Sequence, residues 1–330
     1  MLSQFIIITS IHGVTEAVKA FAGVDGWHVV VVGDKKTPPL DTHPFPNVTF
    51  LSIADQATLP FSFHDHCPFN HYVRKNLGYL YAIQQGATQI ADSDDDNFPY
   101  PDWPGTVAGT ATIATLADAK IVNIYRYFTD QFIWPRGFPL DAILTATTAT
   151  TQPPTSQSIG VWQGLADKDP DVDAIYRLTI NQPVIFDKKP SLALAAGMYC
   201  PFNSQNTIWT TPACFPYLYL PISVSFRFCD ILRSYVAQRG LWAMNARLAF
   251  TTATAYQERN VHDFMVDFKD EIPCYQHVRS VITTLDDLEL TGVPTKDIVT
   301  MYEALQKINV VDQRDVAGVR AFVGDLAGTP

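Results

Sequence analysis

Several kinds of segment are missing from this sequence of 330 residues. No apolar run approaches the ~20 residues that a membrane-spanning helix needs, and MLSQFIIITS lacks a basic region and a cleavage site, so we expect a cytoplasmic chain without membrane insertion. The five cysteines are scattered and form no CxxC pair, which argues against a disulfide framework and a zinc site. No run is rich in Lys and Arg, and the net charge is −10, so nucleic acid is not an expected partner.

The sequence is rich in apolar residues. Hydrophobic residues make up 47% of the chain and charged residues 17%, which is typical of a globular protein with a sizeable core. Aromatic residues make up 12%, enough to leave an apolar interface patch, so the composition is compatible with a homo-oligomer. The negative balance does not exclude a nucleotide, because clustered carboxylates can hold a divalent cation that offsets a diphosphate.

The first hundred residues alternate between strand and helix patterns. Short β-branched runs predict buried strands of a parallel sheet, and apolar residues at helical spacing predict a helix over 70–85 that ends at Gly86. The expected strands are 4–9, 27–32 and 48–52, with a crossover helix at 13–22. A further strand then leads from Thr88 into an acidic cluster that Pro99 and Pro101 terminate. This alternation predicts a doubly wound α/β fold, in which ligands bind beyond the carboxyl ends of the strands.

The second half has a less regular pattern. The Thr, Ala, Gln, Pro and Ser composition of residues 145–158 predicts an exposed loop or hinge. Further expected elements are strands at 183–186 and 192–194 and helices at 222–242, 295–307 and 314–326. We divide the chain into a catalytic domain of residues 1–275, with a nucleotide-sugar half (1–110) and an acceptor half (111–275), and a C-terminal helical extension of residues 276–330.

The acidic cluster is the clearest candidate site. Asp92, Asp94, Asp95 and Asp96 stand together where an apolar strand ends. Carboxylates one or two residues apart in such a turn can bind an octahedral Mg²⁺ or Mn²⁺ and leave positions open for diphosphate oxygens. The alternative is a surface turn with capping aspartates. Arg74 and Lys75, at the start of the preceding helix, could reach a diphosphate or these carboxylates, or could be two surface charges.

A family resemblance spans roughly residues 25–275. The sequence resembles the STELLO family of glycosyltransferases in WHVVVVGDKKTP, RKNLGYLYAIQQGA, IADSDDDN, PRGFPLDAI, QGLADKDPDVDAIYRLT, CPFNSQNT, LYLPISVSFRFCDILRSYVAQRGLW and QERNVHDFMVDFKDE, in this order. More distantly it is similar to plant reversibly glycosylated polypeptides, which are UDP-arabinopyranose mutases. The resemblance implies a GT-A-like fold, here a doubly wound mixed sheet flanked by helices. It also implies a nucleotide-sugar donor, with a UDP-sugar as first choice, and Mn²⁺ or Mg²⁺.

The resemblance also suggests roles for particular residues. The acidic motif of the family falls on Asp94, Asp95 and Asp96, so we expect Asp94 and Asp96 to hold the metal and Asp94 and Asp95 to face the donor. The arginine that becomes glycosylated in the mutases matches Arg136, which has a structural role as its alternative. Because we expect no membrane anchor in this chain, we expect Golgi residence, typical of plant members, only if a partner or a missing segment anchors it.

Further polar residues suggest how the donor and acceptor are bound. We add Asp34, in GDKKTP, and Asn203, in CPFNSQNT, to the donor-binding candidates Arg74 and Lys75. Amide and hydroxyl groups such as those of residues 203–206 suit sugar hydroxyls. The expected helix at 222–242 carries a polar face that is a candidate lining of the acceptor cleft, made of Arg227, Asp230, Arg233 and Gln238.

A second acidic run, in GLADKDPDVDAIYR, supplies the candidate bases. If this segment is extended, Asp169, Asp171 and Asp173 share a face, and Asp171 or Asp173 could deprotonate an acceptor hydroxyl. A capped turn is the alternative. His262 is a candidate third metal ligand, with an exposed or capping role as the alternative.

Three functions are consistent with these features. The first is transfer of a hexose or pentose from a UDP-sugar to a carbohydrate acceptor. The second keeps the donor but makes the protein a mutase or a self-glycosylating protein, with Arg136 as the modified side chain. The third is a non-catalytic scaffold of a polysaccharide-synthesis complex, which would bind neither Mn²⁺ nor UDP.

Overall fold

The N-terminal half of the structure is built on parallel strands, as predicted. The computed structural model describes residues 3–12, 14–39, 45–145, 149–260 and 263–328. Strands β1 (Gln4–Thr9), β2 (His28–Val32), β3 (Val48–Leu51) and β4 (Gln89–Ser93) pair in parallel in the order β3-β2-β1-β4. All five residues of β2 are buried, as expected of a strand covered on both faces.

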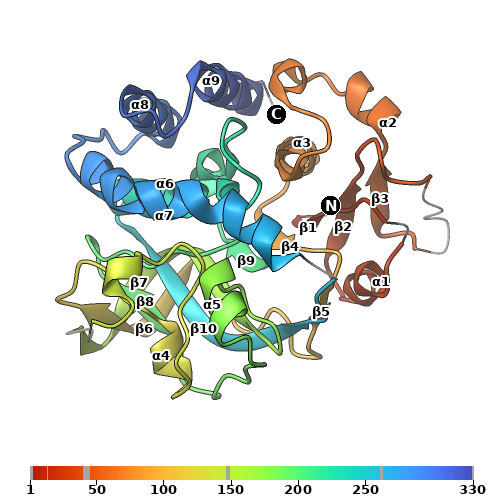
Figure 1. The fold of residues 1–330 in the computed structure, drawn as a ribbon. Helices are drawn as coiled ribbons and strands as arrows, with labels where there is room; N and C mark the ends of the chain where they lie inside the picture. The colour runs from red at the N-terminus through yellow and green to blue at the C-terminus, as the bar shows by residue number, and fades with distance from the viewer. Residues whose placement is uncertain (1–2, 13, 40–44, 146–148, 261–262, 329–330) are drawn as a thin grey trace.

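Helices pack on both faces of this parallel part. They are α1 (Glu16–Ala22), α2 (Ile53–Thr58) and α3 (Lys75–Gln84), and Figure 1 shows α1 and α3 on opposite sides of the strands. The helix expected over 70–85 begins with a 3₁₀ turn, Tyr72–Arg74, and ends before Gly86, whose φ is 87°. At Gly78 the added Cβ of any other residue would lie 2.6 Å from Ile7 and Val32, so α3 approaches the sheet closely there.

The rest of the sheet is mixed. The described residues form ten strands in the order β3-β2-β1-β4-β9-β7-β6-β8-β10-β5, with an additional parallel pairing of β7 and β10. The remaining strands are β5 (Asn97–Pro99), β6 (Thr110–Ala117), β7 (Thr150–Asp167), β8 (Leu192–Leu194), β9 (Asn206–Trp209) and β10 (Ala246–Gln257). A mixed sheet flanked by helices is the GT-A-like α/β class that the sequence predicts.

The largest correction concerns the loop predicted at 145–158, because residues 150–158 form a strand instead, while residues 146–148 lie outside the described residues. Residues 150–158 form the exposed first half of β7 and pair antiparallel with β6. Their polar composition reflects exposure, while the threonines suit a strand. Pro153 and Pro154 fall in an irregularity of the register, between the pairs Ile113↔Thr155 and Thr115↔Gln152, where a residue without an N–H is tolerated.

Smaller differences affect other predicted elements. Residues 183–186 form no strand; Val184 makes only an isolated bridge with Lys168, whereas β8 matches the strand expected at 192–194. The helix predicted at 222–242 begins later, as α6 (Cys229–Ala243). Short helices α4 (Tyr125–Phe128) and α5 (Ala174–Thr179) lie in the predicted acceptor half, residues 111–275.

The C-terminal helices cover one side of the molecule. Helix α7 (Phe264–Asp286) is followed by α8 (Pro294–Lys307) and α9 (Gln313–Ala327), close to the predicted helices 295–307 and 314–326. Figure 1 shows α8 and α9 along the outer edge, beyond α6 and α7. Position 275, where we divide the chain, falls inside α7, and the division stays a prediction.

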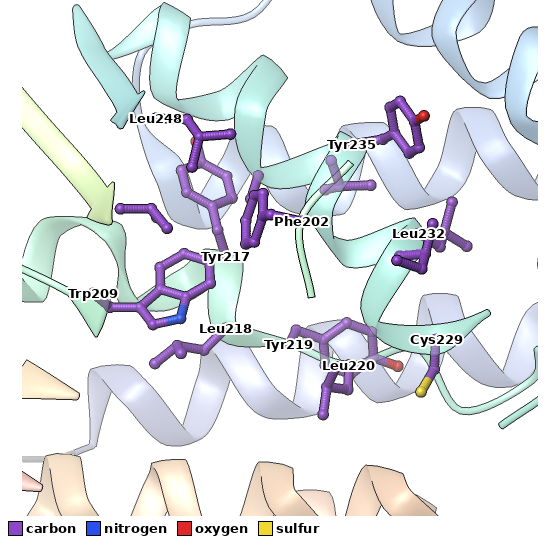
Figure 2. Close-up of a cluster of buried hydrophobic side chains, with 14 of the residues drawn as sticks. Phe202, Trp209, Tyr217, Leu218, Tyr219, Leu220, Cys229, Leu232, Tyr235 and Leu248 are labelled. Atoms are coloured by element: carbon purple, nitrogen blue, oxygen red, sulfur yellow. The ribbon is translucent and has the colours of Figure 1, made fainter. Parts of the chain in front are cut away.

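A large aromatic core joins these layers. Figure 2 shows part of it, which includes Trp209 of β9, Tyr217 and Tyr219, and Leu232 and Tyr235 of α6. Tyr219 also packs edge-on against Tyr302 of α8, and its hydroxyl donates to Asp315 of α9 at 2.8 Å. The last two helices are therefore packed into the same core as the sheet. No helix of the described chain is long and apolar enough to cross a membrane.

Candidate active site

A cavity of about 690 Å³ opens beyond the carboxyl ends of the parallel strands. Thr9 and Ser10 line it where β1 ends, Asp34 after β2, and residues 94–96 after β4. The segment before β9 and the residues after β10 supply the other walls. The position agrees with the rule that ligands of open α/β sheets bind outside the strand ends.

The acidic cluster is divided between the core and the cavity. Asp92 is fully buried within β4, where it contacts Arg233 Nη2 at 3.1 Å and Lys75 Nζ at 3.4 Å. The three aspartates that follow all line the cavity. Asp92 therefore belongs to the framework, and Asp94, Asp95 and Asp96 form the acidic wall.

Each carboxylate of the acidic wall is held by a different element. Asp94 accepts a hydrogen bond from the Tyr72 hydroxyl at 2.9 Å, Asp95 from Ser10 Oγ at 2.5 Å, and Asp96 from Gln257 Nε2 at 3.0 Å. Burial raises the pKa of Asp94 to about 7, opposed by Lys75 and reinforced by the charge of Asp96. Burial also raises the pKa of Asp95.

These carboxylates suit a divalent cation that binds together with its substrate. Within the described residues, no group of three or more His, Cys, Asp or Glu side chains is arranged to hold a metal ion. Mg²⁺ is usually bound by one or two carboxylates plus substrate phosphates, rather than by an all-protein cage. In addition to burial, the charge of Asp96 raises the pKa of both Asp94 and Asp95, and a cation bound to these carboxylate oxygens would offset that repulsion. His262, the predicted third ligand, lies outside the described residues.

Lys75 lies directly beneath the acidic wall. Its ammonium group is fully buried and donates to the Tyr72 hydroxyl and to the backbone oxygen of Ser93, both at 2.8 Å, and to Ser204 O at 3.3 Å. It also lies 3.7 Å from Asp94 Oδ1. With its three donors engaged, Lys75 supplies a fixed positive charge behind Asp94 rather than a group free to reach a ligand.

The other predicted donor-binding residues on this side are also held by the protein. Arg74 is buried, and its guanidinium group donates to Gln56 Oε1 and to the backbone oxygens of Cys67 and Pro68. Asp34 lines the cavity at the end of β2 and accepts hydrogen bonds from its neighbour Lys35 N at 2.7 Å and from His71 N at 3.0 Å. Arg74 thus shapes the loop after the 3₁₀ turn of residues 62–66, and Asp34 fixes the start of the turn before α3.

Arg136 lies in the opposite wall, between two carboxylates. It donates to both oxygens of Asp171 at 2.8 and 2.9 Å, to both oxygens of Asp230 at 2.9 and 2.8 Å, and to Arg227 O. All five N–H donors of the guanidinium group are therefore used. The two carboxylates raise the pKa of Arg136, although burial opposes them, and Arg136 holds the pKa of Asp171 below its usual value despite burial.

The three aspartates of the second acidic run do not share a face, and the alternative of a capping role holds for Asp173. Asp169 pairs with Arg177, Asp171 points to Arg136, and Asp173 caps α5. The fully buried Asp173 carboxylate accepts from Tyr176 N at 2.8 Å and Trp134 Nε1 at 2.7 Å, and it is not among the residues that line the cavity. Of the two candidate bases, the structure brings only Asp171 to the cavity.

Three of the four residues of the amide segment 203–206 line the cavity. Asn203, Ser204 and Gln205 line the cavity just before β9, whereas Asn206 is buried against Trp103 and Thr254. Asn203 Oδ1 accepts from Gln163 Nε2 at 3.1 Å and from Gln205 N at 3.0 Å. These bonds fix the segment beside the acidic wall.

Two further groups were not predicted from the sequence. Ser10 and Gln257 hold Asp95 and Asp96, and each stands directly after or at the end of a strand, β1 and β10 respectively. For Ser10 the sequence carried a signal, since a polar residue after a buried strand at the carboxyl edge is a ligand candidate. For Gln257 it did not, because the pairing of β10 is set by tertiary contacts.

Comparisons with known proteins point to one family. Residues 227–329 match the family model of STELLO glycosyltransferases. The chain is 31% identical over 303 residues to "Probable glycosyltransferase STELLO2" of Arabidopsis thaliana, which covers 86% of this chain and 39% of the relative. It is 30% identical over 291 residues to "Probable glycosyltransferase STELLO1" of the same plant, covering 81% and 37%. The chain thus spans under half the length of these relatives. The resemblance expected from the sequence motifs is confirmed, and the chain belongs to the STELLO family.

Proposed function

We propose that this chain is a glycosyltransferase that binds a nucleotide sugar, a UDP-sugar in the first instance, together with Mn²⁺ or Mg²⁺, and transfers the sugar to a carbohydrate acceptor. The observation that carries the proposal is the acidic wall, three aspartates at the carboxyl edge of a parallel sheet beside a cavity of about 690 Å³. A cavity of this size suits a small-molecule ligand. The names of the two STELLO relatives agree with a transferase.

In this proposal each wall of the cavity has its own task. Asp94 and Asp96 would hold the metal, which when bound would stabilise the charge of the departing diphosphate. Lys75 and Tyr72 fix Asp94 from beneath, and Asp95 stays bonded to Ser10. The charge of Lys75 also limits the repulsion among the aspartates when no metal is present.

Asp171 is the acceptor-side group of the proposal. Its carboxylate lines the cavity and is kept ionised by Arg136. An ionised carboxylate can accept a hydrogen bond from an acceptor hydroxyl and orient it. Because its pKa is lowered, Asp171 is a weak base, and it would take up the proton only as the new glycosidic bond forms. Asn203 and Ser204 are placed to contact sugar hydroxyls.

Self-glycosylation of Arg136 is not favoured by this geometry. A nucleophilic guanidinium nitrogen must lose a proton and face the sugar, but all its donors are bonded to two carboxylates and a backbone oxygen. Intact-mass analysis after incubation with the donor tests this alternative, since a covalent hexose or pentose would have to appear on the protein.

Calorimetric titration of UDP, with and without Mn²⁺, tests the donor site. We expect binding that needs the metal and that is lost in Asp94→Asn/Asp96→Asn, while the exposed Asp102→Asn, outside the cavity, binds as the wild type does. Metal-dependent release of UDP from a panel of UDP-sugars then tests the reaction. Absence of binding to the wild type would favour the scaffold, and binding without release from any UDP-sugar would count against transfer.

A further inference from the structure

Three arginines lie close together beside the cavity, on elements far apart in the sequence. Arg177 belongs to α5, Arg227 precedes α6 and Arg259 follows β10. Their side chains are only 3%, 9% and 9% exposed, respectively. Arg227 and Arg259 line the cavity. Buried guanidinium groups normally bond to carboxylates or backbone oxygens, so a buried arginine without such a partner is unusual.

Two of the three arginines are paired. Arg177 pairs with Asp169 and donates to Pro170 O at 2.9 Å. Arg227 donates through Nε and Nη2 to a single oxygen of Glu271, at 3.0 and 2.8 Å. For these residues the charge is balanced within the protein.

Arg259 differs from its neighbours. Its closest carboxylate oxygen among the described residues is Asp267 Oδ2 at 3.7 Å, too long for a hydrogen bond. Its buried Nε has no hydrogen-bond partner in the described part of the chain; the same holds for Arg177 Nε, but Arg177 has a close carboxylate partner in Asp169, which Arg259 lacks there. Burial, together with the charges of Arg177 and Arg227, lowers the pKa of Arg259 to about 10. An incompletely paired cation among like charges is unfavourable in the absence of a ligand.

The position of Arg259 relates it to the acidic wall. The next residue, Asn260, donates its backbone N–H to Asp96 Oδ2 at 3.3 Å. A group bound at Arg259 would therefore lie beside the predicted metal. Arg227 Nη1 is a further donor on this wall, since the bonds to Glu271 use Nε and Nη2.

We infer that Arg259, assisted by Arg227, forms an anion-binding subsite of the cavity that takes a phosphate or carboxylate group of the substrate. Guanidinium groups bind both kinds of oxyanion through paired, charge-assisted hydrogen bonds. Two sources fit this chemistry, the diphosphate of the donor and the carboxylate of an acidic sugar. The assignment of the source rests on the proposed function, whereas the existence of the subsite does not.

The first experiment uses probes that contain no nucleoside. Inorganic diphosphate and glucuronate are titrated separately into metal-free protein, with binding followed by NMR. At least one should bind the wild type, roughly tenfold or more weakly to Arg259→Met, and with intermediate affinity to Arg259→Lys. Arg320→Met, an exposed residue of α9, is the matched control and should bind as the wild type does.

Thermal unfolding separates binding from a structural role. Arg259→Met should unfold at the same temperature as the wild type or higher, because it removes a buried charge that lacks a close partner. Wild-type affinity of Arg259→Met for both probes, a wild type that binds neither, or weakened binding accompanied by a lower unfolding temperature would each overturn the subsite.

A second set of ligands identifies the source of the anion. If Arg259 holds the diphosphate, Arg259→Met weakens UDP but not uridine. If it holds a sugar carboxylate, the substitution weakens UDP-glucuronate but not UDP-glucose. A wild type that binds inorganic diphosphate through Arg259 but does not bind UDP would retain the subsite and refute the proposed donor, so the two failures are distinguishable.

Discussion

Replacing Arg136 with methionine should strongly destabilise the fold. The guanidinium group lies between Asp171 and Asp230, and the three side chains are 7%, 9% and 7% exposed. Methionine fills a similar volume but leaves both carboxylates buried without their shared cation. Removing one partner of a buried ion pair costs about 3–5 kcal/mol, and here two carboxylates lose the same partner. We therefore expect a loss of about 4 kcal/mol or more in the free energy of unfolding, measured by urea denaturation at pH 7.

The loss of unfolding free energy in Arg136→Met should depend on pH. In the wild type, the pKa of Asp171 is lowered on folding, so the stability that this carboxylate contributes is present above its unfolded pKa and is lost as the pH falls through its lower folded value. In Arg136→Met the burial of Asp171 remains while the cation is gone, which should raise the pKa of Asp171. The loss of unfolding free energy in the variant should then shrink as the pH falls from about 7 towards 4, where Asp171 becomes protonated.

A compensating variant provides the control. Arg136→Met/Asp171→Asn/Asp230→Asn removes all three charges, and it should recover much of the stability, because neutral amides are less costly to bury than unpaired carboxylates. A loss below about 1 kcal/mol in Arg136→Met, or a triple variant no more stable than the single one at pH 7, would refute this account of the opposite wall.

The structure leads to further expected outcomes. Lys75→Met should cost roughly 3 kcal/mol in urea denaturation, because Asp92 and Asp94 lose a buried positive charge. Gly78→Ala should cost about 1–3 kcal/mol in the same assay, since its methyl group would lie 2.6 Å from Ile7 and Val32. Ellman's reagent should modify no thiol of the native protein at pH 8 and all five after unfolding, because each is buried and burial raises its pKa; the thiols are those of Cys67, Cys200, Cys214, Cys229 and Cys274.

Local sequence patterns were sufficient to predict the first half of the fold. The runs at β1 and β2 are apolar because both faces of a parallel strand are covered, and helical spacing with a following glycine marks the end of α3. The acidic wall follows from the same logic, because the residues after β4 must lie at the carboxyl edge of the sheet. Here periodicity alone determined which end of the sheet holds the candidate site.

The structure of the second half depends on tertiary contacts that local sequence patterns do not reveal. The polar first half of β7 has a loop-like composition and becomes a strand only because β6 pairs with it. Asp171 and Asp173 look alike in the sequence, but one meets Arg136 across 35 residues while the other caps the helix beside it. Which carboxylate reaches the cavity is decided by the tertiary position of Arg136, so sequence spacing could not separate the two candidates.

The cavity also differs from a site built for a neutral sugar alone. Arg136 with Asp171 and Asp230, and Arg227 with Glu271, are paired within the protein. The acidic wall and Arg259 are less fully balanced, and they carry opposite signs. A ligand complementary to both must bring a cation and an anion together, as a metal-bound diphosphate does. If that proposal holds, each component binds better when the other is present, and linkage requires Mn²⁺ to raise the affinity for UDP by the same factor by which UDP raises the affinity for Mn²⁺.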